Sequence, residues 1–214
     1  EFLQYAPESA AAQAVPVAIT DYSTSGMTEG PFVAMPPPTA SGSNTPIELA
    51  DAVPLEAVTV YHAGAPIFVR VTDRDQNLDV GAVETVNVTL TVNATGDREV
   101  LRLQETGQDT GVFTGYIQSY LIASNPGSAQ PANGQLGLHE KVNITGRYVD
   151  VVDDTDTTTE SALVDPFGVV FDSSTGQVID GDAGLCSLDN ADFVRELGYM
   201  YVFGLKGNQP SLFE

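Results

Sequence analysis

The residues best suited to chemistry form an acidic run in which every second side chain carries oxygen, within "VRVTDRDQNLDV" (69–80). Calcium takes carboxylate and amide oxygens as ligands, and alternating residues of a loop can turn toward one centre. A glutamate occupies the twelfth position counted from the first aspartate, as it does in EF-hand loops. The candidate metal ligands are Asp73, Asp75, Asn77, Asp79 and Glu84.

Two features of this run leave a second interpretation open. The sixth position is Leu78, where an EF-hand needs glycine, and the pattern predicts no flanking helices. Asp and Asn also favour turns, because their side chains accept backbone N–H groups. Closely spaced carboxylates repel one another without a cation. The run is therefore either a calcium loop or a solvated turn.

A second acidic cluster, "DVVDDTD" (150–156), has less pattern than the first. Its carboxylates follow no regular spacing, and Asp is common in exposed loops. A solvated loop is the favoured interpretation here, with a metal site as the alternative. The residues concerned are Asp150, Asp153, Asp154 and Asp156.

The sequence offers little for catalysis or for a transition metal. His62 and His139 have no further histidine or cysteine at a metal-binding spacing, so a zinc site is not expected. No G-x-S-x-G motif is present, and "ETGQDTG" (105–111) lacks the lysine and following helix of a phosphate-binding loop. The absence of Trp disfavours a glycosidase. We therefore expect no enzymatic activity.

The charge of the chain limits its partners. Its 214 residues include 29 Asp and Glu but 8 Lys and Arg, a formal net charge of −21. Phosphate backbones repel such a chain, so nucleic acid is excluded, whereas saline surroundings or divalent cations suit it.

The lone cysteine, Cys186, excludes an internal disulfide framework. No apolar run reaches the roughly 18 residues of a membrane span. A start without Met indicates a processed or trimmed product.

Short runs of β-branched and aromatic residues, bounded by Gly and Pro, dominate the centre of the chain. In "ETVNVTLTVNATGD" (84–97) the apolar residues alternate with polar ones, which is the period of a half-buried antiparallel strand. About six such strands, with no convincing helix between them, predict an all-β antiparallel sandwich over residues 56–165.

The flanking segments predict an arm and a tail. Residues 1–55 are rich in Pro, Ala and Ser, and "PPP" (36–38) opposes regular structure, so they form either a flexible linker or an extended arm that packs on a neighbour. Residues 166–214 predict a β-rich extension, with "DSSTGQ" as a hairpin turn. Asp189 or Asn190 begins a short predicted helix, and a last strand follows it.

Two motifs together give a specific resemblance. The D-x-D-x-N-x-D run is followed by a Val/Thr strand pair and an E-T-G-x-x-T-G-x-F-x-G hairpin. This order resembles the immunoglobulin-like repeat modules of large bacterial surface and secreted proteins. The hairpin residues are Glu105, Thr106, Gly107, Thr110, Gly111, Phe113 and Gly115. "DPFGVVFDSSTGQVIDG" (165–181) resembles the opening of a carboxypeptidase-regulatory-like or Cna-B-like module, although too few residues remain to complete one.

The resemblance implies an immunoglobulin-like fold and extracellular, structural or adhesive work. We expect a secreted or cell-surface subunit of a filament, sheath or surface layer, whose partners are other copies of itself. An open sheet edge can accept a strand from a neighbour, and residues 1–35 are the expected donated segment. The alternative is a calcium-dependent adhesive or glycan-binding module of a larger surface protein.

Overall fold

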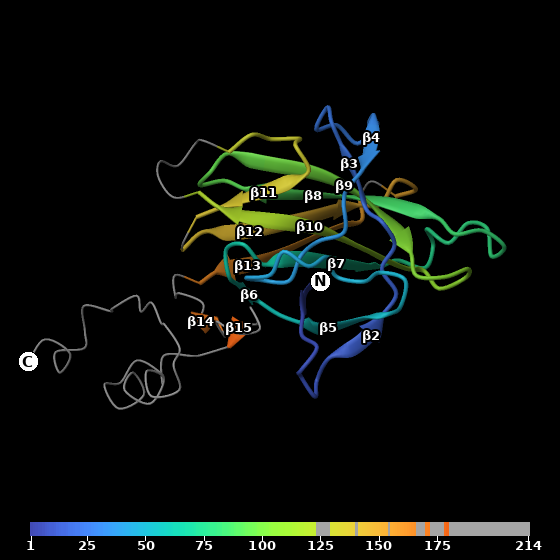
Figure 1. Ribbon diagram of the computed structural model, residues 1–214. Coiled ribbons are helices and arrows are strands. Elements are labelled where there is room, and N and C mark those ends of the chain that lie inside the picture. Colours follow the sequence, from blue (N-terminus) through green and yellow to red (C-terminus); the bar gives the residue numbers. More distant parts are fainter. Residues whose placement is uncertain (123–128, 140, 154, 166–169, 172–177, 180–214) are drawn as a thin grey trace, which may run out of the picture.

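The structure, a computed structural model, describes residues 1–122, 129–139, 141–153, 155–165, 170–171 and 178–179 (Figure 1). This part of the chain is all-β, without helices, as the sequence predicted. None of its segments is a helix long and apolar enough to cross a membrane. The helix and last strand expected in the tail, and Cys186, lie outside the described residues.

The strands are short near the start of the chain and longer in its centre. The first eight are β1 (Phe2–Tyr5), β2 (Gln13–Val15), β3 (Asp21–Ser23), β4 (Phe32–Ala34), β5 (Val53–Ala57), β6 (Val60–Tyr61), β7 (Pro66–Thr72) and β8 (Thr85–Val92). The others are β9 (Asp97–Glu105), β10 (Val112–Leu121), β11 (Gln135–Leu138), β12 (Asn143–Val149), β13 (Thr157–Val164), β14 (Val170–Phe171) and β15 (Val178–Ile179).

Thirteen of these strands join one curved sheet, and the layers it forms are sandwich-like. The strand order is β2-β5-β1-β7-β10-β9-β8-β12-β13-β6, with β11 beside β10, and β3 with β4 beside β9. Most pairs are antiparallel, as expected, but β10 with β11 and β13 with β6 run parallel. β14 and β15 form a separate antiparallel pair on either side of the predicted "DSSTGQ" turn.

Alternation decides which face of each central strand is buried. In β8, Val86, Val88, Leu90 and Val92 are buried, and the residues between them are more exposed. This is the face that the sequence period predicted. These side chains share one core with Leu101 and Leu103 of β9, and with aromatic residues of β7 and β10.

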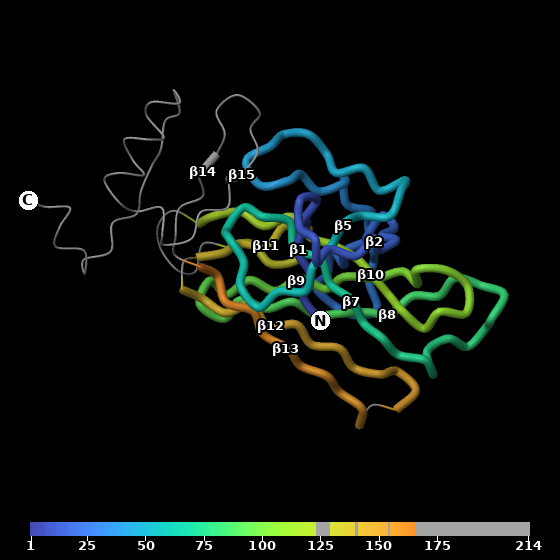
Figure 2. The backbone as a smooth tube through the Cα atoms, turned by 90° about the horizontal axis from the view of Figure 1, so that it is seen from below, coloured from blue at the N-terminus to red at the C-terminus, as the bar shows by residue number. Residues whose placement is uncertain are grey.

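The first 55 residues are woven into the same sheet (Figure 2). β1 lies between β5 and β7, and Phe2 and Leu3 are each 2% exposed. The Phe2 ring meets Tyr61 edge-on, with 6.0 Å between centroids, and Tyr61 Oη donates a 2.5 Å hydrogen bond to Leu3 O. The segment expected as an arm therefore supplies part of the core of its own chain.

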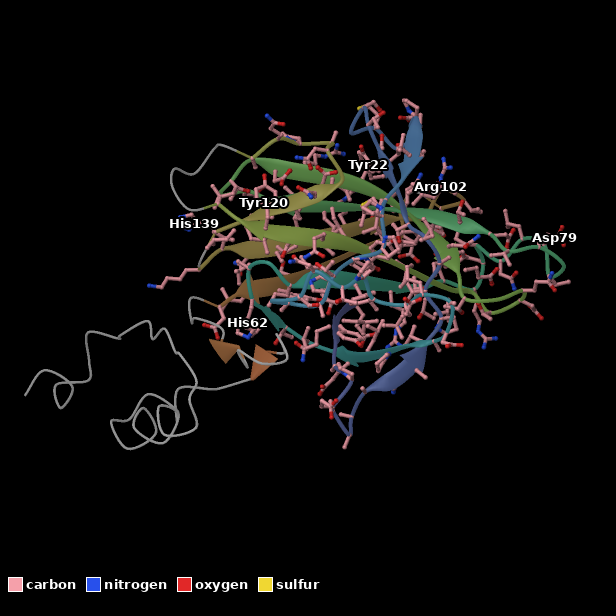
Figure 3. All side chains as sticks on the ribbon, in the orientation of Figure 1. Tyr22, His62, Asp79, Arg102, Tyr120 and His139 are labelled. Carbon is pink, nitrogen blue, oxygen red and sulfur yellow. The ribbon has the colours of Figure 1, made fainter. Side chains whose placement is uncertain are left out.

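The β3–β4 hairpin of this segment is held against the outside of β9. Arg102 of β9 places its guanidinium 3.7 Å from the centre of the Phe32 ring, a cation–π contact (Figure 3). The same guanidinium lies 4.0 Å from the Asp21 carboxylate. One charged side chain thus anchors both strands of the hairpin.

The ends of five central strands lie at the same end of the sheet (Figure 1). Thr72, at the end of β7, pairs with Val112, at the start of β10. The end of β9 and the start of β8 lie next to them, since Thr85 pairs with Gln104. Tyr148, near the end of β12, pairs with Val88. The loops that carry both acidic clusters therefore leave the sheet at the same end.

Candidate metal centre

Asp73 is fixed at the point where β7 ends. Its backbone N–H donates a 2.8 Å hydrogen bond to Gly111 O, at the foot of the neighbouring strand β10. Its side-chain Oδ2 accepts a 2.6 Å hydrogen bond from Tyr148 Oη on β12. The backbone of Asp73 is thereby fixed to the β9–β10 turn, and its carboxylate to β12.

The "ETGQDTG" hairpin explains how Asp73 is positioned. Glu105 Oε1 accepts hydrogen bonds from the backbone N–H groups of Thr110 (2.8 Å) and Gly111 (2.7 Å). Gly111 has φ +59°, and a Cβ atom there would lie 2.9 Å from Arg74 Cα and 3.0 Å from Asp73 O. Only glycine allows the turn to pack this closely on the Asp73 loop.

Asp150 comes from the second acidic cluster and is only 1% exposed. Its Oδ1 accepts hydrogen bonds from Gln76 Nε2 (2.5 Å) and from the backbone N–H groups of Val152 (2.7 Å) and Asp153 (3.2 Å). Its Oδ2 is buried and has no hydrogen-bond partner among the described residues. A buried carboxylate oxygen without a partner is costly, and a bound ion or water is one way to satisfy it.

Asp73, Asp75 and Asp150 bring their carboxylates together. One oxygen from each lies within 4.8 Å of the other two. The ion pairs formed among the described residues involve none of these three side chains. Three negative charges without a positive partner make a site that a metal cation would stabilise, and oxygen-only donors select a hard cation.

The pKa values of Asp73 and Asp75 reflect this crowding of carboxylates. The pKa of Asp75 is raised to about 6, because its carboxyl shares a hydrogen bond with Asp73 and lies close to that charge. Burial acts to raise the pKa of Asp73, but hydrogen bonds from Asp75 and Tyr148 outweigh it and lower the pKa. The two carboxyls thus hold a proton between them more readily than either would alone.

The other three predicted ligands make contacts elsewhere, Asp79 and Glu84 within their own loop and Asn77 with the β9–β10 turn. Asp79 Oδ1 accepts the Gly81 N–H at 2.9 Å, and Asp79 lies at the outer end of the loop (Figure 3). The Glu84 carboxylate accepts the N–H groups of Leu78 (2.7 Å) and Asp79 (3.1 Å). Asn77 Nδ2 donates to Asp109 Oδ1 at 2.7 Å. These residues stabilise a turn, and only Asp73 and Asp75 of the predicted set join the cluster.

Asp150 is the ligand that sequence reasoning placed in a solvated loop. A signal for its burial is present in β12. Ile144 and Tyr148 are buried there, and Gly146 lies midway between them on the same face of the strand. Continuing this period of two by one step puts Asp150 on the inward face. The alternation would therefore have singled out this one aspartate of the second cluster.

A pocket of about 460 Å³ adjoins the cluster. Asp73, Asp75 and Tyr148 form part of its wall, and the strands β7, β12 and β13 supply most of the rest. Asp150 is not among the lining residues. An ion held by the three aspartates would consequently have buried protein on one side and the pocket on the other.

No protein-family model matches this chain, and no curated protein is significantly similar to it. The fold and this site therefore carry what is known about function.

Proposed function

We propose that this chain is a non-catalytic structural subunit of an extracellular assembly, and that a calcium ion held by Asp73, Asp75 and Asp150 clamps its β-sandwich. The observation that carries the proposal is the buried Oδ2 of Asp150, which has no hydrogen-bond partner among the described residues, in a carboxylate that lies beside two others. A cation there would tie the end of β7 to the end of β12.

Calcium suits these three carboxylates better than magnesium, because it accepts irregular geometry and six to eight oxygen ligands at about 2.3–2.6 Å. Magnesium demands a near-ideal octahedron at about 2.0–2.1 Å and keeps several of its waters. The three oxygens lie within 4.8 Å of one another, a spacing that one calcium ion can bridge.

The extracellular location is supported by the small number of protein ligands. Calcium sites in extracellular modules typically have dissociation constants of about 10⁻⁴–10⁻³ M, which suits the calcium level outside cells. A site with three carboxylates, one of them on the exposed residue Asp75, belongs to this weak class. The net charge of −21 is also compatible with a saline exterior.

Assembly by strand exchange is supported by the geometry of β1. This strand of four residues fills a slot between β5 and β7, through three residue pairs on one side and two on the other. The corresponding strand of a second copy would meet the same backbone groups and the same pockets for Phe2 and Leu3. Exchange that does not close on itself would produce a filament.

A disulfide lock tests strand exchange directly. Gln4 and Glu56 face each other across β1 and β5, so Gln4→Cys with Glu56→Cys, in a Cys186→Ser background, would hold β1 in its own chain. We expect filaments or large oligomers, seen by electron microscopy and sedimentation, to be lost when the disulfide forms and restored by reduction.

The matched control places a disulfide where it leaves β1 free. Thr145 and Ser161 face each other across β12 and β13. Thr145→Cys with Ser161→Cys should assemble in both redox states. Assembly that persists with β1 locked would contradict strand exchange.

The pocket beside the cluster favours a second candidate function, a calcium-dependent binding module. The two functions are compatible, because an exchanged β1 would place the same Glu1 and Phe2 side chains against this pocket. A monomeric chain that still binds a ligand in calcium would favour the binding module.

A further inference from the structure

The pocket beside the cluster is acidic and partly closed by an internal ion pair. Five carboxylates and two guanidinium groups line it, among them Arg70, Asp73, Asp75, Asp156 and Glu160. Arg70 Nε already donates to Glu1 Oε2 at 2.9 Å, so this guanidinium is engaged. The free groups of the pocket are mainly hydrogen-bond acceptors.

A calcium ion in the cluster would have unfilled coordination positions. Calcium takes about six to eight oxygens, and three aspartates supply only part of them. Asp150 is buried and does not line the pocket, whereas Asp73 and Asp75 do. Water or the oxygens of a ligand in the pocket could therefore fill the remaining positions of an ion held by all three.

The charges around these positions select the ligand. The five lining carboxylates and Asp150 carry six negative charges, whereas two guanidinium groups, the Glu1 amino group and one divalent ion carry five positive ones, so an anionic ligand gains little. A neutral polyhydroxyl compound offers hydroxyl donors to the carboxylates and pairs of adjacent oxygens to the ion. The hydroxyl of Thr158 on β13 also lines the pocket and can both donate and accept.

We propose that this pocket binds a neutral carbohydrate, with two adjacent sugar hydroxyls coordinated to the calcium ion and further hydroxyls donating to the acidic wall. The inference rests on the proposed calcium site. A volume of about 460 Å³ is that of a small-ligand pocket, large enough for one or two sugar rings.

The test uses free sugars as probes. The methyl glycosides of mannose, galactose, fucose and glucose are offered to the whole chain, and saturation-transfer NMR records binding in calcium and in EDTA. Methyl glucuronide is the charged counterpart of methyl glucoside. We expect at least one neutral glycoside to bind in calcium and to be released by EDTA. If methyl glucoside binds, it should bind at least tenfold more tightly than methyl glucuronide.

Two variants separate sugar binding from ion binding. Thr158→Phe fills the pocket and leaves the three aspartates unchanged, so it should abolish sugar binding and keep the rise in melting temperature caused by calcium. Thr159 neighbours it on β13 but does not line the pocket, since successive strand residues face opposite sides. Thr159→Phe should retain both properties.

Each outcome bears on a different claim. Calcium that stabilises the chain while no neutral glycoside binds, or while the glucuronide binds best, would overturn the carbohydrate inference alone. Sugar binding that survives EDTA would also overturn it. Calcium that has no effect on stability would contradict the metal site on which the inference depends.

Discussion

At the scale of single residues, Asp150 and Gly111 do more for the site than their immediate sequence suggests. Asp150 contributes a buried oxygen that accepts no hydrogen bond from the part of the chain that the structure describes. Gly111 allows the β9–β10 turn to touch the backbone of the Asp73 loop. Asp79 and Glu84, which fit the calcium pattern by spacing, instead accept backbone N–H groups. Spacing alone cannot distinguish these roles, because turns and metal loops use the same residue types.

Replacing Gly111 should damage both stability and calcium binding. Gly111→Ala adds a Cβ at φ +59° and 2.9 Å from Arg74 Cα, so we expect a loss of about 1–3 kcal/mol in the free energy of unfolding. Calcium affinity should fall too, because Asp73 moves with its loop. Urea unfolding and calcium titration measure the two effects.

Gly107 provides the matched control in the same turn. A Cβ there would meet only Thr110 Cγ2, at an ordinary 3.6 Å. Gly107→Ala should therefore change both quantities little. Equal losses for the two variants would mean that the close approach at Gly111 is unimportant.

Glu99 should make stability depend on pH. This carboxylate is 0% exposed, and burial raises its pKa to about 7, although it accepts N–H groups from Asn133 (2.9 Å) and Gly134 (3.1 Å). Between the ordinary pKa of 4.5 and about 7 the folded state holds a proton that the unfolded state has lost. The contribution of Glu99 is therefore fully present below the unfolded pKa and is lost as pH rises through about 7.

The variant Glu99→Gln removes this titration. We expect wild-type stability to fall by about 1–3 kcal/mol between about pH 4.5 and about pH 7.5 relative to the variant. Urea unfolding at both pH values gives the difference. Parallel pH profiles for the two proteins would show that Glu99 titrates alike in the folded and unfolded states.

At the scale of elements, the sequence predicts what is local and misses what depends on distant partners. The alternation of β8 identified its buried face, because one strand carries the whole pattern. The strands β1 to β4 have three or four residues each, too few to show a period, and they lie in a Pro- and Ala-rich segment. Their structure comes from pairing: β1 pairs with β5 and β7, more than fifty residues later.

The stability of β1 should depend on one buried hydrogen bond that a side chain donates to its backbone. Tyr61→Phe removes the donor to Leu3 O and leaves that carbonyl without its side-chain partner. We expect a loss of about 1–2 kcal/mol and faster hydrogen exchange in Phe2–Tyr5. Exchange measured by NMR reports on the strand, and urea unfolding reports on the whole chain.

Tyr116 offers a comparison with a longer hydrogen bond. Its Oη donates to Met35 O at 3.3 Å, and the residue is equally buried at 1% exposure. Tyr116→Phe should cost less and leave the exchange of β1 unchanged. If Tyr61→Phe also leaves that exchange unchanged, the bond to Leu3 does not secure β1.

At the scale of the whole molecule, the candidate site exists because the fold brings two acidic clusters together. Gln76 and Asp150 share a hydrogen bond although they lie 74 positions apart in the chain. The sequence contained every ligand, but each cluster was interpretable only by itself, since no local pattern indicates that the ends of β7 and β12 meet. The net charge of −21 means that the molecule as a whole, like this site, attracts cations.

The most direct test of this account compares wild type and Asp150→Asn by thermal unfolding in EDTA and in calcium. Asparagine keeps an acceptor for Gln76 and removes the buried negative charge. In calcium at about one hundred times the dissociation constant, wild type should gain about 2.7 kcal/mol and the variant little. In EDTA the melting temperature of the variant should equal or exceed that of wild type, because no ion then compensates the buried charge.

The control variant is Asp153→Asn, which alters a carboxylate bonded to Thr155 in the same loop. It should respond to calcium as wild type does. A wild-type chain indifferent to calcium, or an Asp150→Asn chain that gains as much as wild type, would contradict the proposed metal site.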